Sequence, residues 1–447
     1  MFARNVLLTY LTELIGAGFS FLTGVLLARG LSPADRGVMV LVMTLPNLMF
    51  NLLNLGLHES TTFFIGRKKA APGAVLVNAL ALSGVTGAAA FGLLALFRAP
   101  AAAFFTKGLP GDLWLPVALL VPAALVQGLL LSMLRAKMRF ARMNAWRLVA
   151  SVVTLAGFGI ALFGARGGLR ASVLAYFWIT LPLAGLAFLL VAQIVPLRGG
   201  WQPRLSEEML RYGLKSYAQG MISGMNYRLD VYLVALFLQT QDVAFYGIAF
   251  ALAEIAWFLP NAAGTVLFPR LANAPLEDVH RLTAAACRTI VALTALTAAG
   301  VALVSPLIPI VYGAAYWRSI PPLLILLPGV VLMAVHKVLG RNFASRDRQQ
   351  YTIAASLVSF FIILILDLVL IPRLGVEGAA LASSLGYCAA AAALIAFFVR
   401  DSGLPPREFL IITRADMRAL LAAARGSLPG LRPAASATPA ASGKESQ

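Results

Sequence analysis

Long apolar segments follow one another along almost the whole chain, and short polar intervals separate them. Each is long enough to cross the hydrocarbon core of a bilayer as a helix, which takes about 20 residues. The pattern therefore predicts an all-α polytopic membrane protein with twelve transmembrane helices. The expected spans are roughly 5–28, 37–65, 73–97, 114–134, 145–165, 171–195, 217–238, 244–269, 282–304, 320–340, 351–372 and 376–399.

Composition points the same way. Hydrophobic residues make up 60% of the 447 residues, charged residues only 12%, and the mean hydropathy is +0.84. A soluble domain of this length does not need so much apolar surface. The apolar run that follows Arg4 is too long for a cleaved signal peptide, so we expect a retained first span.

Charge gives the expected orientation. The formal net charge of +18 would suggest a nucleic-acid partner in a soluble chain. Here most Lys and Arg residues fall in alternate intervals, beginning with Arg67-Lys68-Lys69, on the side where the N-terminus would lie. This positive-inside bias predicts that both termini are cytoplasmic. Because aromatic and basic residues do not interleave, we expect no nucleic-acid partner.

Polar residues recur at helical spacing in four of the apolar segments. Residues three or four apart share one helix face, so each set forms a stripe. Ionised groups at membrane depth are costly and usually face a partner or a watery cavity. The stripes are Thr9, Glu13, Gly16, Ser20 and Thr23 in the first span; Thr44, Asn47, Asn51, Asn54 and His58 in the second; Gln219, Ser223, Asn226 and Asp230 in the seventh; and Glu254, Asn261 and Thr265 in the eighth.

These stripes predict a central, water-filled cavity between the two halves of the chain. Its expected lining residues are Glu13, Asn47, Asn51, Asn54, Asn226, Arg228, Asp230, Glu254 and Asn261. The alternative is that such groups hydrogen-bond between packed helices, at about 0.6 kcal/mol a pair. Arg228 and Asp230 lie nearly opposite each other on one helix, so one of them is expected to face a neighbouring helix instead.

Other polar groups in apolar segments have simpler interpretations. We expect Asp367 and Arg288 to form structural ion pairs or to snorkel, and Lys337 to snorkel toward the membrane surface. The only cysteines, Cys287 and Cys388, lie in apolar segments without metal-ligand spacing. We therefore expect no disulfide framework, metal site or cofactor.

The chain divides at its longest hydrophilic interval, which follows six spans and precedes six more. The predicted parts are an N-terminal six-helix lobe (1–197), a cytoplasmic linker (198–216), a C-terminal six-helix lobe (217–400), a cytoplasmic amphipathic segment (401–426) and a disordered tail (427–447). Thr413-Arg414-Ala415-Asp416 resembles a capping box that begins a helix on the inner membrane surface.

The two predicted lobes also share a weak internal repeat. One offset places Gly37 on Gly247, Thr44 on Glu254 and Asn51 on Asn261. Six spans is an even number, so the lobes would have the same orientation. They would be related by a pseudo-two-fold axis along the membrane normal.

Four short motifs lie at the ends of predicted spans. They are Ala28-Arg29-Gly30-Leu31-Ser32-Pro33-Ala34-Asp35-Arg36-Gly37 between the first two spans, Asn54-Leu55-Gly56-Leu57 at the end of the second, Arg228-Leu229-Asp230 with Tyr246-Gly247-Ile248-Ala249 in spans 7–8, and the run from Leu370-Ile371-Pro372 to Ala382 between spans 11 and 12. Each resembles the motif at the same place in polysaccharide repeat-unit flippases, which belong to the multidrug/oligosaccharidyl-lipid/polysaccharide exporter superfamily.

The resemblance implies two six-helix lobes in a V that work by alternating access. It implies a bacterial cytoplasmic membrane and an undecaprenyl-diphosphate-linked oligosaccharide moved from the inner to the outer leaflet, with membrane lipid and polymerase or other assembly proteins as partners. Members often keep several cavity arginines, whereas here Arg228 is the one deep cation expected. Independently of the resemblance, acids in apolar segments suggest ion coupling, and we expect Asp230 or Glu254 to exchange a proton or sodium ion.

Other functions fit less well. A drug or small-molecule cation antiporter of the same superfamily is the nearest rival, and a major-facilitator transporter also has twelve spans. A membrane-embedded polysaccharide polymerase or ligase would need positioned catalytic groups, usually on a sizeable outer loop. The predicted outer loops at 98–113 and 305–319 hold no acid pair, activated nucleophile or metal cluster. We therefore expect a transporter and not an enzyme.

Overall fold

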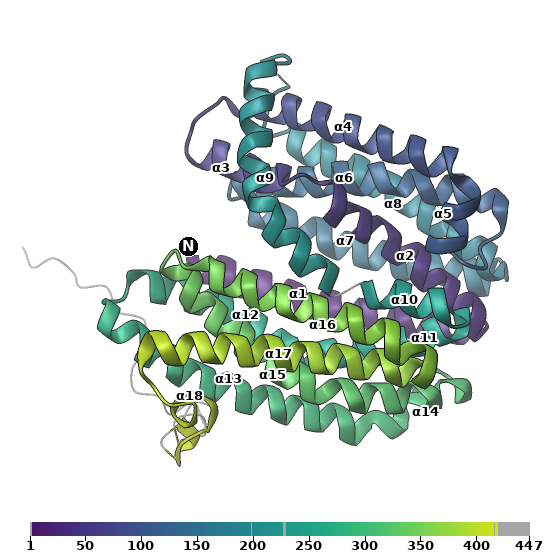
Figure 1. Ribbon diagram of the computed structural model, residues 1–447. Coiled ribbons are helices and arrows are strands. Elements are labelled where there is room, and N and C mark those ends of the chain that lie inside the picture. Colours follow the sequence, from purple (N-terminus) through teal and green to yellow (C-terminus); the bar gives the residue numbers. More distant parts are fainter. Residues whose placement is uncertain (1, 198, 227–228, 415, 419–447) are drawn as a thin grey trace, which may run out of the picture.

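The computed structural model describes residues 2–197, 199–226, 229–414 and 416–418. Within these ranges, the side chains of residues 2–10, 215, 216, 218–226, 265, 266, 269, 272, 276 and 277 are not described. The described part is helical and contains no strand. The all-α prediction is therefore confirmed, and the long helices form the bundle that Figure 1 shows.

The first half of the chain contributes eight α-helices. They are α1 (Phe2–Gly30), α2 (Pro33–Leu53), α3 (Leu57–Gly66), α4 (Pro72–Leu96), α5 (Arg98–Phe105), α6 (Trp114–Ala136), α7 (Phe140–Gly159) and α8 (Gly168–Ala192). A π-helical turn, η2 (Ile160–Gly164), extends α7. The long α9 (Pro203–Asn226) then packs against α3 and α4 at one part and α16 at another, so it links the two halves.

The second half begins with the short α10 (Leu229–Phe237) and ends with the short α18. The others are α11 (Thr240–Ala253), α12 (Phe258–Asn273), α13 (Leu276–Val304), α14 (Ile308–Tyr312), α15 (Ile320–Ser345), α16 (Gln349–Leu374), α17 (Val376–Ser402) and α18 (Arg407–Leu410). Two 3₁₀ segments connect helices of this half: η3 (Glu254–Trp257) lies between α11 and α12, and η5 (Ala314–Ser319) lies before α15.

Eleven helical segments of the described chain are long and apolar enough to cross a membrane. They match eleven of the predicted spans, so the chain is a multi-pass membrane protein. The remaining predicted span, 217–238, is divided between α9 and α10, and residues 227–228 between them lie outside the described residues. The count of twelve and the symmetry of two lobes therefore stay predictions, as do the domain boundaries.

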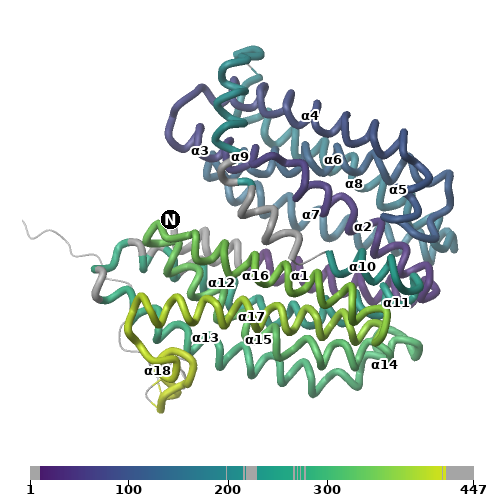
Figure 2. Tube along the Cα trace, viewed as in Figure 1, coloured from purple at the N-terminus to yellow at the C-terminus, as the bar shows by residue number. Residues whose placement is uncertain are grey.

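Buried apolar side chains of the described residues form three separate cores. One core joins both halves at the end of the bundle where α2, α6, α11 and α15 begin. At the opposite end, one core lies within the first half, between Phe64 and Met209, and another lies within the second half, between Ala284 and Phe409. The helices accordingly converge where α10, α11 and α14 lie and spread apart toward α3 and α18 (Figures 1 and 2).

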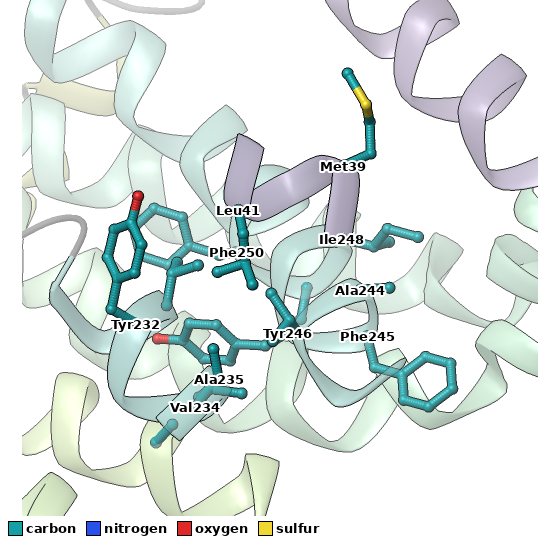
Figure 3. Close-up of a cluster of buried hydrophobic side chains, with 14 of the residues drawn as sticks. Met39, Leu41, Tyr232, Val234, Ala235, Ala244, Phe245, Tyr246, Ile248 and Phe250 are labelled. Atoms are coloured by element: carbon teal, nitrogen blue, oxygen red, sulfur yellow. The ribbon is translucent and has the colours of Figure 1, made fainter. Parts of the chain in front are cut away.

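Two glycines let α2 and α11 cross closely in the shared core. A Cβ atom on Gly37 would lie 1.6 Å from the carbonyl oxygen of Thr240, and one on Gly247 would lie 3.3 Å from Val40 of α2. Gly37 and Gly247 are the pair that the internal repeat superposes. Beside this crossing Leu41, Tyr246 and Phe250 gather in the core (Figure 3).

The second predicted span is not one helix. It breaks at Asn54, because Leu55 and Gly56 take left-handed backbone conformations with φ of 50° and 69°. The Asn54 side chain completes the break: its Oδ1 accepts from the Gly56 backbone N–H at 2.8 Å. The expectation that His58 continues the polar stripe of this span is therefore wrong, since His58 belongs to the separate helix α3.

A buried asparagine fixes the linker between the halves. Asn78 of α4 is fully buried. Its Oδ1 accepts hydrogen bonds from the Gln202 backbone and the Ser206 hydroxyl, both at 2.8 Å, and its Nδ2 donates to the Gly200 carbonyl at 3.3 Å. The start of α9 is thereby held against the first half.

The capping box predicted near the C-terminus is present. Thr413 Oγ1 accepts from the Asp416 backbone N–H at 3.2 Å, and the Asp416 carboxylate accepts from the Thr413 backbone N–H at 3.0 Å. Arg288 of α13 pairs with Asp416 at 2.8 Å, which is the structural ion pair expected for this arginine. Residue 415 and residues 419–447, including the predicted disordered tail, lie outside the described residues.

Candidate functional site

A cavity of about 1100 Å³ lies between the two halves of the chain. Helices α1 and α7 line one side of it, and α11, η3, α12 and α15 line the other. It occupies the region between the two separate cores. The shared core closes the opposite end.

Of the nine candidate residues, three line this cavity: Glu13 of α1, Glu254 of η3 and Asn261 of α12. Glu254 lies where α11 ends and a single 3₁₀ turn replaces the α-helix predicted for the eighth span. A 3₁₀ turn within a long helix often marks a hinge or a functional position. The helix geometry therefore changes at a residue that lines the cavity.

Three more candidates do not line the cavity. Asn47, Asn51 and Asn54 lie on α2 and at its end, and the last two direct their amides at carbonyl groups one turn earlier. Asn226 and Arg228 cannot be placed, because the side chain of Asn226 and the whole of Arg228 lie outside the described residues.

Asp230 lies in a separate buried cluster. It is only 1% exposed. Its Oδ2 accepts a hydrogen bond from the hydroxyl of Tyr246, and the Ser383 hydroxyl lies 3.4 Å from the same oxygen. The cluster thus combines α10, α11 and α17 within the second half.

Asp367 of α16 belongs to the same region, since α10 packs against α16 and the Asp367 carboxyl group lies close enough to that of Asp230 to interact with it electrostatically. Asp367 is fully buried, and neither of its oxygens has a hydrogen-bond partner among the described residues. The expectation of a structural ion pair for Asp367 is therefore wrong for the described part of the chain. An unpaired buried carboxylate is strongly unfavourable, so a proton or a cation must accompany it.

Four basic residues near the cavity were missed by the sequence analysis as binding groups. Arg36, Arg147 and Arg341 line the cavity, and Lys337 donates to Asn261 Oδ1 at 3.1 Å. Lys337 is expected from the sequence to snorkel toward the membrane surface, and Arg147 and Arg341 belong to the Lys and Arg residues that give the positive-inside bias. They lie about one or two helical turns inside the ends of α7 and α15, which places their charges within the bundle.

Lys337 has a specific environment. Its ammonium group lies 4.8 Å from the centre of the Trp257 ring, a cation–π geometry, and it interacts electrostatically with Glu254. Arg341, one turn further along α15, faces the cavity beside Gly264. The spacing of four residues between Lys337 and Arg341 was the signal that could have identified this face.

On the opposite wall, Arg147 donates to Glu13 at 3.1 Å, and both side chains are substantially exposed to the cavity. Among the described side chains, four basic groups thus face two carboxylates in or beside the cavity. The cavity is therefore net positive, and it suits an anionic ligand.

At the closed end of the bundle, basic side chains of the first half donate hydrogen bonds to backbone carbonyl groups at helix ends of the second half. Lys107 Nζ donates to the Leu238 carbonyl at 2.8 Å, just after α10, and Arg29 Nε donates to the Val311 carbonyl at 2.9 Å, near the end of α14. Cations at helix C-termini complement the unpaired carbonyls and the helix dipole.

The chain is similar to known proteins in both sequence and structure. Residues 26–321 match the model of a family described as "Polysaccharide biosynthesis protein". The "Probable low-salt glycan biosynthesis flippase Agl15" of Haloferax volcanii is 23% identical over 392 residues, which are 86% of this chain and 81% of that protein.

Solved structures share the fold. The lipid II flippase MurJ in an inward closed conformation has a TM-score of 0.78 at 14% identity, over 94% of this chain and 93% of that one. A multidrug resistance MATE transporter of the MOP superfamily has a TM-score of 0.71 in an inward-facing conformation, at 16% identity over 87% of this chain and 94% of that one. An outward-facing MATE structure has a TM-score of 0.63, at 15% identity over 90% of this chain and 96% of that one.

Proposed function

We propose, because this chain belongs to the polysaccharide biosynthesis protein family, that it is a flippase that carries a lipid-linked glycan across a membrane. Family membership confirms the resemblance to polysaccharide flippases noted in the sequence. The relatives described above are named as flippases or transporters, and this chain is proposed as a transporter and not an enzyme.

The observation that carries the proposal is the net positive cavity between the halves. An undecaprenyl-diphosphate-linked oligosaccharide brings a diphosphate, and charge-assisted hydrogen bonds from Lys and Arg suit its oxygens. Lys337 and Arg341 present such donors on one face of α15. Glu13, Glu254 and Asn261 then offer acceptors for sugar hydroxyls, while the lipid tail stays in the bilayer.

The proposed orientation follows from the positive-inside rule. It places the end with α3 and α18 in the cytoplasm and the shared core at the outer surface of a bacterial inner membrane. The cavity then faces the cytoplasm, which is an inward-facing state. The better superposition on the inward-facing than on the outward-facing transporter supports this assignment.

We assign ion coupling to the buried acids. Asp230 and Asp367 lie in the second half away from the cavity wall, so a proton or sodium ion bound there would alter packing between α10 and α16 without contacting the glycan. Glu254 remains the alternative coupling group, because it lies at the 3₁₀ turn and beside Lys337.

Transport of a fluorescent undecaprenyl-diphosphate disaccharide in proteoliposomes tests the proposal. We expect the intact protein to flip it, and Lys337→Gln and Arg341→Gln each to weaken binding roughly tenfold to a hundredfold, as for the loss of one charge-assisted hydrogen bond. The matched control is Arg204→Gln, a fully exposed arginine at the start of α9.

The outcome also decides between the two transporter classes. If the vesicles do not flip the lipid but do exchange a cationic dye such as ethidium for protons or sodium, the chain is a small-molecule antiporter and the proposal is wrong. If Asp230→Asn and Asp367→Asn leave the pH and sodium dependence of flipping unchanged, the coupling assignment is wrong.

A further inference from the structure

A small side pocket opens from the central cavity toward the closed end of the bundle. It has a volume of about 250 Å³ and lies between α1, α2 and α7. The pocket and the cavity share Ser20, Gly24, Arg36, Ala150 and Ser151 as lining residues. A ligand in the cavity can therefore extend one of its ends into this pocket.

Arg36 is the charged group of the pocket, and it is unsatisfied. Its Nε atom is buried without a partner, and its guanidinium makes no hydrogen bond or ion pair with any described residue. The adjacent acid, Asp35, is engaged with the helix N-cap, because it accepts from the Ser32 hydroxyl at 2.8 Å. A buried guanidinium without a partner lowers the stability of the protein unless an anion binds to it.

Hydroxyl groups form the rest of the polar wall. They belong to Ser20, Thr23, Ser151 and Thr154, and no acidic side chain lines the pocket among the described residues. Thr23 and Ser151 donate to carbonyl groups of their own helices at 2.8 and 3.0 Å. Their lone pairs therefore remain available to accept hydrogen bonds from a ligand.

This pocket is far from the basic face of α15. Arg36 lies beside Tyr316, four residues before the start of that helix, whereas Arg341 lies near its end. The 21 residues between Ile320 and Arg341 span about 30 Å at 1.5 Å per residue. One diphosphate group cannot contact both arginines, so the two positions must recognise different anionic groups.

We propose that Arg36 and the surrounding hydroxyls form a second subsite that binds the carboxylate of an acidic sugar, such as a uronic acid, in the glycan. This rests on the proposed function, in which the lipid diphosphate binds near Lys337 and Arg341. A planar guanidinium binds a carboxylate through two parallel hydrogen bonds. The chain would then select repeat units that carry an acidic residue several sugars away from the lipid.

Two probes separate this inference from the proposed function. Binding to the purified full chain is measured for farnesyl diphosphate and, separately, for cellotetraose with or without a terminal glucuronate. We expect the acidic tetrasaccharide to bind at least tenfold more tightly than the neutral one. Arg36→Gln should remove that preference, with a loss of about tenfold to a hundredfold, and should leave farnesyl diphosphate binding unchanged.

The reciprocal variant and the controls complete the design. Arg341→Gln should weaken farnesyl diphosphate binding and preserve the preference for glucuronate. Arg36→Lys should retain part of the preference, because it keeps the charge but loses the planar fork. Arg318→Gln, on an exposed arginine that lines neither the cavity nor the side pocket, should change neither. Thr154→Val, which changes the wall and keeps Arg36, provides a second test if Arg36→Gln fails to fold.

Two results would overturn the inference, provided that farnesyl diphosphate still binds in an Arg341-dependent manner. One is that the parent protein binds both tetrasaccharides equally. The other is that Arg36→Gln and Thr154→Val both bind the acidic tetrasaccharide as tightly as the parent does. In that case the proposed function stands and the subsite does not. Absence of farnesyl diphosphate binding would instead remove the proposed function.

Discussion

Replacing Gly37 by alanine should force the closed end of the bundle apart. The added Cβ would lie 1.6 Å from the carbonyl oxygen of Thr240, whereas a carbon–oxygen contact needs about 3.3–3.6 Å. Since the obstacle is backbone, α2 and α11 must separate by about 2 Å. Overpacking of this kind costs about 1–3 kcal/mol. The closed state should therefore lose about fivefold to about 150-fold in population relative to a state in which this end is open.

The assay reports which side of the membrane reaches the cavity. Cys287 and Cys388 are both free and can be replaced by alanine, after which Ser151→Cys supplies one reporter in the cavity wall. A membrane-impermeant maleimide added outside should label this cysteine faster in Gly37→Ala than in the parent. Labelling from the cytoplasmic side should fall in parallel.

The control is Gly84→Ala on α4, where an added Cβ meets no atom within 4 Å. It should label like the parent, and better helix propensity should make it no less stable. If Gly37→Ala also labels like the parent and melts at the same temperature, then the close crossing of α2 and α11 does not hold the cavity closed at this end.

Three further predictions concern single contacts. Lys107→Ala should expose the carbonyl groups at the end of α10 and raise outside labelling of the same reporter, but less than Gly37→Ala, because one cation at a helix end contributes about 0.3–1 kcal/mol. Asn78→Ala should leave buried backbone groups of the linker unpaired, which lowers the free energy of unfolding by about 1–3 kcal/mol for each unsatisfied group. The melting temperature should fall accordingly. Asn78→Asp keeps the acceptor and should recover part of the loss. Hydrogen bonding to Arg288 and Thr413 holds the pKa of Asp416 well below its usual range. The contribution of this contact to stability is therefore fully present above the ordinary carboxyl pKa of about 3.9. It is lost as the pH falls through the lowered pKa of Asp416. Protease cleavage within residues 411–414, which follow α18, should stay slow at neutral and mildly acidic pH. Arg288→Ala should make this cleavage fast throughout; equal rates in both proteins would contradict the contact.

The apolar pattern was sufficient to predict the fold class and eleven of the spans. In the bilayer the backbone N–H and C=O groups of an apolar segment can only be hydrogen-bonded within the segment itself, which makes it a helix. It could not show that the second span breaks after Leu53. That break depends on left-handed conformations at Leu55 and Gly56 and on the approach of Gly213 from α9, to which a Cβ on Gly56 would lie within 2.1 Å. Such tertiary contacts leave no periodic signal.

The binding groups were harder to predict than the helices. Glu13, Glu254 and Asn261 stand out in the sequence as polar residues in apolar segments, and they line the cavity. Arg36 and Arg341 do not, because arginines near helix ends are also what the positive-inside rule and interfacial anchoring produce. Only the packing of the two halves shows that these side chains turn inward.

The shared core has a thermal consequence for transport. To expose the cavity on the other side, the helices must part where this apolar core now joins them, and water must enter. Wetting buried apolar surface raises the heat capacity. The free-energy difference between the two access states should therefore depend on temperature in a curved manner, as the free energy of unfolding of a small domain does. An Arrhenius plot of the turnover rate should accordingly not be a straight line.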